Sequence, residues 1–297
     1  MRIGFIGLGR MGMGMVTRLL PRHQVVAYDL SREQVVKASE KGTVPAYSLE
    51  ELAEKLVPPR IAWMMVPAGK PVDEVIEGLK PLLSPGDILI DGGNSLYKDS
   101  VRRAEELREK GISYLDVGTS GGIEGSAKGL SLTVGGDAES FETVEPLLRD
   151  LAAPGGFCYC GPSGSGHYVK MVHNGVEYAV LQALGEGFEM LRSGPYQLDL
   201  ARVAGTWNNG SVIRSWLLEK AEKVLADPEL EEVAGEVGGG ETGRWMVEAA
   251  LEREVPIPVI CAALLARYRS RQSDSFSGKL VAALRREFGG HEVKRKE

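Results

Sequence analysis

The chain has 297 residues, a formal net charge of −6 and a hydrophobic content of 43%. Its length suits two domains, and its negative charge argues against a nucleic-acid-binding protein, whose contact face would be basic. No apolar run approaches the roughly 18 residues of a membrane span. The chain starts on a strand pattern rather than a signal peptide, so we expect a cytoplasmic protein that contacts no membrane.

Three cysteines and four histidines are present. Their spacing matches no metal-ligand pattern, so no metal is expected. The sparse, odd number of cysteines is typical of a reducing compartment. We therefore expect Cys158, Cys160 and Cys261 to be small buried residues.

Apolar and helical patterns alternate in the first half of the chain. Strands are predicted at 2–7, 25–28, 61–66, 88–91, 114–117, 131–134 and 157–159, with helices between most of them. Ser31 is expected to cap the helix after the second strand. This alternation predicts a parallel, doubly wound sheet.

Beyond about residue 163 the sequence contains no convincing strand pattern. A long helix is predicted over 166–192, although it contains Gly175, Gly185 and Gly187, for which close helix packing is the expected reason. Shorter helices are predicted at about 199–208, 211–225, 242–253, 256–269 and 273–288. The charged tail, residues 291–297, is expected to be solvated.

A glycine-rich loop follows the first strand and opens the first helix. It reads Gly7, Leu8, Gly9, Arg10, Met11, Gly12, which matches GxGxxG. Gly7 permits the tight turn, Gly9 lets the backbone approach a pyrophosphate, and Gly12 lets the helix pack closely on the strand. A plain glycine-rich turn is the alternative, but the strand–loop–helix context favours a dinucleotide site. The predicted fold class is therefore an α/β Rossmann-type domain at 1–164, followed by an all-α substrate and dimerisation domain at 165–297.

Asp29 ends the second strand, where a carboxylate can accept a hydrogen bond from the adenosine ribose and repel a 2′-phosphate. This favours NAD over NADP. Arg32 is the complication, because it could pair with a 2′-phosphate, and a simple turn or helix-capping aspartate is the alternative. Val66, at the end of the third strand, and Asn94, after the fourth, complete the predicted cofactor set.

The predicted long helix carries one polar face. Lys170, His173, Asn174 and Glu177 are spaced at i, i+3, i+4 and i+7. An amine, an imidazole and a carboxylate on one face can supply a proton acceptor and a proton donor. A solvated charged stripe explains the spacing equally well.

Four segments resemble the 6-phosphogluconate dehydrogenase family. They are the run from Lys170 through His173-Asn174 to Glu177-Tyr178, the loop Asp91-Gly92-Gly93-Asn94-Ser95, the loop Ser120-Gly121-Gly122, and the tail Phe288-Gly289-Gly290-His291. The likeness covers essentially the whole chain. The chain is shorter than the long members and resembles the short class, which is often NAD-dependent.

The resemblance implies oxidative decarboxylation of 6-phosphogluconate to ribulose 5-phosphate and CO2 with reduction of NAD. Neutral Lys170 would take the proton of the carbon-3 hydroxyl, which requires a lowered pKa. It would then stabilise the enolate as CO2 leaves, and Glu177 would protonate carbon 1 of the enediol. By the same resemblance His173 and Asn174 would orient hydroxyls, Asn94 would contact substrate and cofactor, and Ser120, Gly121 and Gly122 would hold the carboxylate end.

The resemblance also places a phosphate site in the helical domain. Its members are Tyr178, Thr242, Arg267, Arg285 and His291. The last two would come from the partner subunit's C-terminal tail, which implies a homodimer or a higher homo-oligomer. Where the long members have a lysine two residues before the threonine, this chain has Gly240, which leaves an unphosphorylated acid possible. A solvated helix face is the alternative for the arginine cluster of the C-terminal helices, which consists of Arg267, Arg269, Arg271, Arg285 and Arg286.

Two other functions remain open at this level. A β-hydroxyacid dehydrogenase, acting on a 3-hydroxyisobutyrate-like substrate or gluconate without decarboxylation, would share the glycine loop, Ser120 and Lys170; His173, Glu177 and the C-terminal arginines argue against it. A non-catalytic NAD-binding sensor would share the fold. The amine and carboxylate on one helix face argue against a sensor.

Overall fold

The computed structural model describes residues 1–295 and forms two compact units, Met1–Asn174 and Gly175–Glu297. The division lies inside α8 (Ser165–Arg192), a single 28-residue helix. The predicted border after residue 164 lies at the start of this helix and stays a prediction. Lys296 and Glu297, at the end of the predicted tail, lie outside the described residues. Among residues 1–295, none of the helices combines the length and apolarity of a membrane span.

The first unit is built on an eight-stranded sheet in the order β3-β2-β1-β4-β5-β6-β7-β8. The strands are β1 (Arg2–Ile6), β2 (Gln24–Tyr28), β3 (Val44–Pro45), β4 (Ile61–Met64), β5 (Ile88–Asp91), β6 (Ser113–Ser120), β7 (Leu130–Gly135) and β8 (Ala152–Gly161). The first six run parallel in the Rossmann order, which confirms the predicted fold class.

The prediction of a wholly parallel sheet is wrong at the last two strands. β7 runs antiparallel to β6, and β8 runs parallel to β7. The reason is the length of the β6–β7 connection, because a crossover to a parallel strand needs about a dozen residues or more. Here only α6 (Gly122–Lys128) and single flanking residues separate the two strands.

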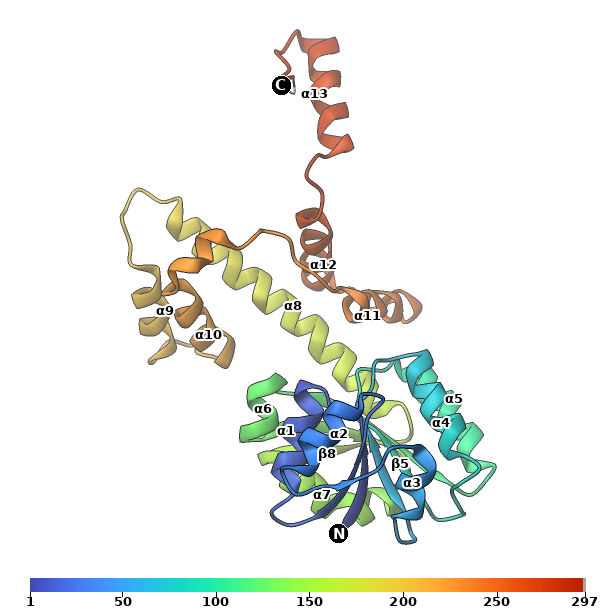
Figure 1. Ribbon diagram of the computed structural model, residues 1–297. Helices are drawn as coiled ribbons and strands as arrows, with labels where there is room; N and C mark the ends of the chain where they lie inside the picture. Colours follow the sequence, from blue (N-terminus) through green and yellow to red (C-terminus); the bar gives the residue numbers. More distant parts are fainter. Residues whose placement is uncertain (296–297) are drawn as a thin grey trace. The chain divides into compact units, whose positions relative to one another are not determined.

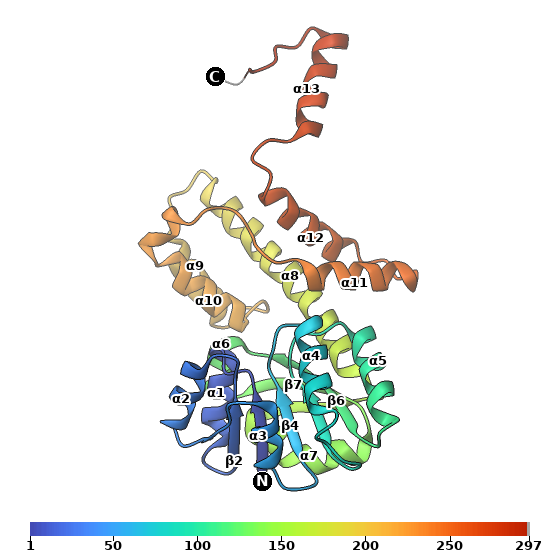
Figure 2. The same ribbon diagram turned by 45° about the vertical axis from the view of Figure 1, so that its right-hand side comes forward.

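Helices cover both faces of the sheet (Figure 1). They are α1 (Arg10–Leu19), α2 (Arg32–Ser39), α3 (Leu49–Glu54), α4 (Lys70–Leu79), α5 (Tyr97–Arg108), α6 and α7 (Ala138–Leu151). Phe5 of β1 packs in one core cluster with side chains of α1 and α7. Its neighbour Ile6 packs in the other with α4 and α5, which lie side by side (Figures 1 and 2). Successive residues thus face opposite layers, which explains the continuous apolar runs.

Two local expectations fail in this unit. Ser31 does occupy the N-cap of α2, but its side chain makes no capping hydrogen bond. Its backbone N–H donates instead to Asp29 Oδ1 over 2.7 Å. The cysteines are not buried: Cys158 is exposed, and Cys160 and Cys261 are partly exposed. Cys158 and Cys160 lie on β8, which is the edge of the sheet and therefore lacks a covering neighbour on one side.

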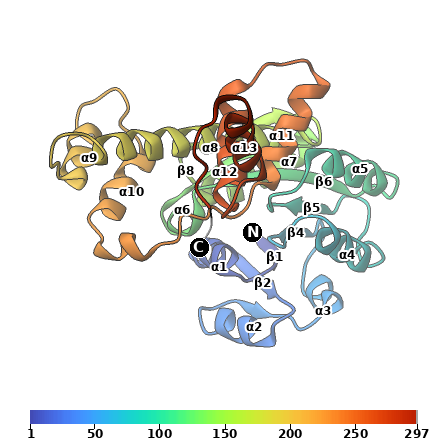
Figure 3. The ribbon, with the colours of Figure 1, turned by 90° about the horizontal axis from the view of Figure 1, so that it is seen from above.

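The second unit is helical throughout its described residues. It contains the second part of α8, then α9 (Leu200–Asn208), α10 (Trp216–Leu225), the 3₁₀ helix η1 (Pro228–Glu232), α11 (Glu241–Glu252), α12 (Pro258–Ser270) and α13 (Phe276–Gly289). α9 and α10 pack side by side (Figure 3) around Leu218 and Ala204. Helix α10 begins later than the predicted residue 211 because Ser215 caps it, accepting a hydrogen bond from the N–H of Leu218.

The glycines of α8 have different surroundings. A Cβ at Gly175 would lie 2.0 Å from Met246 Sδ, so close helix packing is confirmed there. At Gly185 and Gly187 nothing lies within 4 Å of such a Cβ, and the packing explanation is wrong.

Candidate active site

The glycine loop between β1 and α1 has the shape of an anion cradle. Gly7 has φ of 94°, and a Cβ there would lie 2.4 Å from the carbonyl oxygen of Met65. A Cβ at Gly12 would lie 2.0 Å from the carbonyl oxygen of Gly7. At Gly9, by contrast, nothing lies within 4 Å, and no side chain caps α1. The loop therefore offers free space beside a helix N-terminus, which suits a pyrophosphate.

A cleft of about 790 Å³ opens beside this loop, along the carboxyl ends of the parallel strands. Its lining includes Gly7, Gly9, Arg10, Met11, Gly12, Asp29, Val66 and Asn94. Leu8 is the exception among the predicted cofactor residues, since its side chain is buried in the core. Pro67, Ala68 and Thr119 also line the cleft and were not predicted. The one feature of the sequence that could have indicated them is their position at the carboxyl ends of predicted strands, where such folds bind ligands.

Asp29 holds the glycine loop in place. Its Oδ2 accepts the backbone N–H of Leu8 over 2.6 Å, and its Oδ1 accepts that of Ser31. A carboxylate has about four acceptor positions, so it can still accept a ribose hydroxyl. The guanidinium of Arg32 stacks on the ring of Tyr47, 4.5 Å from the centroid. Leu8, named as a cofactor residue, therefore contributes through its backbone.

A buried carboxylate on β6 anchors the first turn of α8. Asp116 is fully buried, and its two oxygens accept the backbone N–H groups of Gly164 (2.6 Å) and His167 (2.8 Å). Negative charge at a helix N-terminus is stabilising. A Cβ at Gly118 would lie 2.4 Å from Lys170 Cβ, so the helix lies directly on the strand. These contacts fix the height of Lys170 above the sheet.

Five predicted side chains of the first unit meet on this helix and the neighbouring loops. His173 Nδ1 lies 3.4 Å from Lys170 Nζ and 3.2 Å from Asn174 Oδ1. Asn174 Nδ2 donates to Asn94 Oδ1 over 3.2 Å. On the other side of the ring, His173 Nε2 lies 3.2 Å from Ser120 Oγ. The polar face is therefore a connected network rather than a merely solvated stripe.

The loop after Ser120 depends on glycine. Gly121 has φ of 128° and Gly122 has φ of 59°, both in the region that L side chains rarely adopt. Gly121 is the N-cap of α6 and Gly122 its first residue. Their backbone N–H groups lie at a helix start, where an anion can be held.

The second unit contains a separate cluster. Glu177 and Tyr178 follow on α8 and are both half-buried. Tyr178 Oη lies 3.2 Å from Thr242 Oγ1, near the start of α11. The guanidinium carbon of Arg267, on α12, lies 3.7 Å from the centroid of the Tyr178 ring. Three of the five predicted phosphate residues are thus brought together.

The glycine segment before α11 has its own support. Gly240 has φ of 121°, a conformation that strains any side chain, so glycine suits this position better than lysine. Arg271 donates to the carbonyl oxygen of Val237 over 2.8 Å and also to that of Gly239. Arg271 was not predicted as a site residue, and its signal was only membership of the arginine cluster.

Arg285 and His291 are not brought to this cluster. Arg285 lies on α13 and His291 follows it, and both are exposed. Within residues 1–295, neither contacts Tyr178, Thr242 or Arg267. The same described residues contain no group of three or more His, Cys, Asp or Glu side chains that could hold a metal ion.

Comparison with known proteins matches both parts of the chain to domains of one enzyme family. The model of the NAD binding domain of 6-phosphogluconate dehydrogenase matches residues 2–164, and that of its C-terminal domain matches residues 166–275. The chain is 50% identical to the NAD(+)-dependent, decarboxylating 6-phosphogluconate dehydrogenase of Haloferax volcanii and 48% identical to Bacillus subtilis YqeC, in both cases over 100% of each protein.

Among solved structures, Plasmodium falciparum 6-phosphogluconate dehydrogenase, studied with NADP+ and with 6-phosphogluconate, matches with a TM-score of 0.84 and 32% identity. The match covers 100% of this chain and 67% of that one. The first unit is thus a nicotinamide-dinucleotide-binding domain, and the chain belongs to the 6-phosphogluconate dehydrogenase family of oxidoreductases.

Proposed function

We propose that this protein oxidises and decarboxylates 6-phosphogluconate to ribulose 5-phosphate and CO2, with NAD as the hydride acceptor. The observation that carries the proposal is the network that joins Lys170, His173 and Asn174 of α8 to Asn94 and Ser120. The same helix also bears Glu177. The full-length Haloferax volcanii relative bears this activity in its name.

The cleft beside the glycine loop fits the cofactor. The proposed NAD site uses the open space at Gly9 for the pyrophosphate, Asp29 for the ribose, and the Val66 and Asn94 loops for the nicotinamide half. When bound, NAD supplies a hydride acceptor. Asp29 supports NAD over NADP because its negative charge would face a 2′-phosphate. Arg32 does not remove this preference while it stacks on Tyr47.

Proton transfer is assigned to Lys170. As a neutral amine it removes the proton from the carbon-3 hydroxyl while the hydride leaves carbon 3. The product is a β-keto acid, and the new ammonium donates a hydrogen bond to the enolate oxygen as CO2 departs. Glu177 then protonates carbon 1 of the resulting enediol, which is carbon 2 of the substrate. His173 can assist both states of the amine, because its Nδ1 donates a hydrogen bond to a neutral amine in one tautomer and accepts one from an ammonium in the other.

The two ends of the substrate are assigned to different elements. Ser120, Gly121 and Gly122 hold the carboxylate end at the start of α6. The phosphate is assigned to Tyr178, Thr242 and Arg267, beside the uncapped start of α11. Arginine and helix N-termini are the groups that proteins use for phosphate.

A second copy of the chain is proposed to complete this site through Arg285 and His291. Helix α13 exposes Phe276, Leu280, Val281, Leu284 and Phe288, which recur on one side of the helix. An apolar stripe of this kind is costly in water. Pairing of two chains would cover it and bring the tail to the neighbouring site.

The test is an assay of 6-phosphogluconate, gluconate and 3-hydroxyisobutyrate with NAD or NADP, following reduced cofactor by absorbance and CO2 from carbon-1-labelled acid. We expect equal amounts of NADH and CO2 from 6-phosphogluconate. NADH without CO2 would identify a β-hydroxyacid dehydrogenase. If no acid yields reduced cofactor, the remaining alternative is a non-catalytic NAD-binding sensor. Glu177→Gln should slow CO2-linked product formation more than oxidation.

A further inference from the structure

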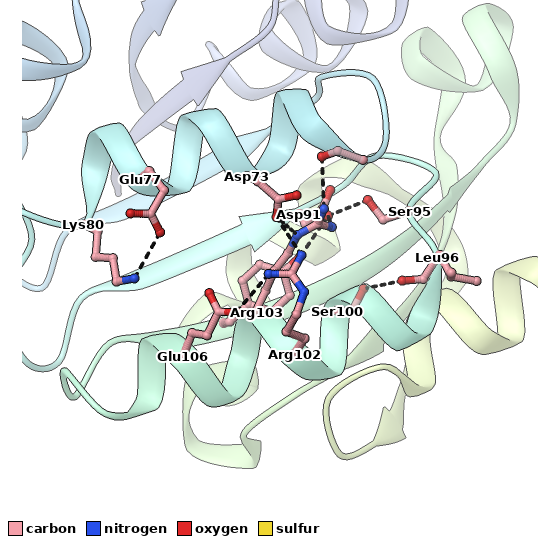
Figure 4. A network of polar contacts seen from close by, with 12 residues as sticks. Asp73, Glu77, Lys80, Asp91, Ser95, Leu96, Ser100, Arg102, Arg103 and Glu106 are labelled. Atoms are coloured by element: carbon pink, nitrogen blue, oxygen red, sulfur yellow. Dashed lines mark hydrogen bonds and ion pairs between the residues drawn. The ribbon is translucent and has the colours of Figure 1, made fainter.

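Arg103, on α5, is a buried arginine outside the cleft that joins three segments of the first unit. Only 1% of its surface is exposed. Its Nε donates to Asp73 Oδ1 over 2.8 Å, its Nη2 donates to the carbonyl oxygen of Gly69 over 3.0 Å, and its Nη1 lies 3.6 Å from Asp91 Oδ2 (Figure 4). A buried guanidinium is tolerated only where partners of this kind compensate its lost hydration.

Asp91, the last residue of β5, is the partner nearest the cleft and is fully buried. It accepts hydrogen bonds from Ser95 Oγ (2.7 Å), Tyr114 Oη (2.8 Å) and the backbone N–H of Gly93 (3.0 Å). Burial, reinforced by the Asp91 charge, raises the pKa of Tyr114, so its hydroxyl keeps the proton that it donates. Both ends of the Gly92–Ser95 loop are therefore tied to one carboxylate.

The second segment held by Arg103 is the loop that leads from β4 to α4. Gly69 ends this loop, and Val66, Pro67 and Ala68 line the cleft. The two loops touch, since a Cβ at Gly93 would lie 3.0 Å from the carbonyl oxygen of Val66. Arg103 thus hydrogen-bonds the β4–α4 loop directly and lies at ion-pair distance from Asp91, the carboxylate that holds the Gly92–Ser95 loop.

Asn94 is the residue that such an anchor would serve. It lies in the loop held by Asp91, lines the cleft, and accepts a hydrogen bond from Asn174 on α8. Through Asn174 it is connected to His173 and Lys170. A shift of the Gly92–Ser95 loop would therefore move Asn94 relative to the reacting groups.

We infer that Arg103 and Asp91 are positioning residues for the reaction, which lock the two loops together and hold Asn94 against cofactor and substrate. Only one part of the inference, the role of Asn94 beside cofactor and substrate, rests on the proposed function. A purely structural role is the competing explanation, since breaking a buried ion pair also lowers stability. The experiment must therefore separate geometry at Asn94 from loss of folded protein.

A double-mutant cycle between Arg103→Lys and Asn94→Ala makes this separation. Lysine keeps the charge but cannot reach Asp73, Gly69 and Asp91 together, because it has no planar fork of donors. Small misplacements in an active site can cost up to about 100-fold in rate. We expect Arg103→Lys to lower kcat/KM about tenfold in the wild-type background and to have almost no further effect after Asn94→Ala.

The matched control is Arg60→Lys. Arg60 makes the same type of ion pair, to Asp87 over 3.2 Å, but at the amino ends of β4 and β5, away from the cleft. This variant should lower Tm and leave kcat/KM unchanged. If Arg103→Lys does not fold, Asp73→Asn replaces it in the cycle. This substitution weakens the ion pair of Arg103 from the side of Asp73, whose side chain is half-exposed and easier to change.

The outcomes separate the inference from the proposed function. Equal losses from Arg103→Lys with and without Asn94 would overturn the inference, as would kcat/KM values that simply follow Tm across all variants, Arg60→Lys included. If wild-type protein does not oxidise 6-phosphogluconate, the proposed substrate fails instead. The same cycle can then be measured as the Kd for NADH, because both loops line the cleft.

Discussion

The two clusters of the candidate site differ in how deeply their supporting charged groups are buried and in how those groups are bonded. In the first unit, the central charges are buried and held by several partners: Asp91 and Asp116 pair in register across β5 and β6, and one anchors the Asn94 loop while the other anchors α8. In the second unit, Arg267 is partly exposed and lies against an aromatic ring, and Arg271 is exposed and bonds loop carbonyls.

This difference indicates a division of labour. Lys170 is half-buried and His173 exposed, but the buried carboxylates hold the elements that carry the reacting groups. Such a preorganised cluster suits the chemical step. The more exposed arginines attract an anion through a field that dissolved salt screens, so the second cluster suits substrate binding. Substitutions in the first cluster should therefore change kcat, whereas those at Tyr178, Thr242 and Arg267 in the second should change KM.

The largest effect is expected at Lys170. Lys170→Met removes the proposed proton acceptor, and acid–base catalysis contributes about 10²- to 10⁴-fold. We expect kcat for 6-phosphogluconate to fall about 1000-fold or more while the Kd for NADH stays unchanged, since Lys170 does not line the cofactor cleft. Lys110→Met, at an exposed turn after α5, is the matched control. A rate within tenfold of wild type would remove Lys170 from this role.

A smaller effect, of a different kind, is expected at Arg267. A charge-assisted hydrogen bond contributes about 1.5–3 kcal/mol, or roughly 10- to 100-fold in affinity. Arg267→Gln should raise KM for 6-phosphogluconate by that factor, with kcat within a few-fold of wild type and gluconate turnover unaffected. Arg269→Gln is the control on the same helix, because Arg269 bonds the carbonyl oxygen of Gln272. A fall in kcat without a change in KM would break the division of labour.

A shift of about tenfold is expected in cofactor preference. Asp29→Asn keeps an acceptor for the Leu8 N–H but removes the charge that would face a 2′-phosphate. The ratio of kcat/KM for NAD to that for NADP should fall about tenfold, measured by absorbance of the reduced cofactor. A wild-type preference for NADP would contradict the NAD assignment outright, whatever the variant does.

Much of the fold could be predicted because the relevant signals are local. Apolar runs locate the strands of a sheet that is buried on both faces, and the glycine loop is recognisable between a strand and a helix. The reversal of β7 could not be predicted in the same way, because it depends on which strand pairs with β6. The role of Ser31 likewise depends on Asp29, whose carboxylate already accepts its backbone N–H.

The candidate site residues that share one helix face could be predicted from their spacing. The buried charged residues that support them could not. Lys170, His173 and Asn174 are spaced for one face, and the structure joins them. Arg103, Asp91 and Asp116 carry no periodic signal, since charged residues are ordinarily exposed. Only the fold shows which carboxylates lie in the core and which donors surround them.

The smallest expected effect is a loss of thermal stability at acid pH that arises from Asp73 in the first unit. Burial of Asp73 raises its pKa, but hydrogen bonds from Arg103 and Arg102 lower it further, and the net pKa lies below the usual 3.8. The folded state therefore holds the Asp73 proton less tightly than the unfolded state does. Its contribution to stability is present above pH 3.8 and is lost as the pH falls through the lowered pKa.

Asp73→Asn should remove this contribution. The variant should have a lower Tm than wild type at pH 7. The difference should shrink as the pH falls below 3.8 towards the lowered pKa, because the unfolded state then takes up the Asp73 proton before the folded state does. Asp199→Asn, which keeps the capping acceptor of α9 in the second unit, is the control. A Tm difference that stays constant from pH 7 to pH 3 would show that the Asp73–Arg103 pair does not stabilise the first unit through its charge.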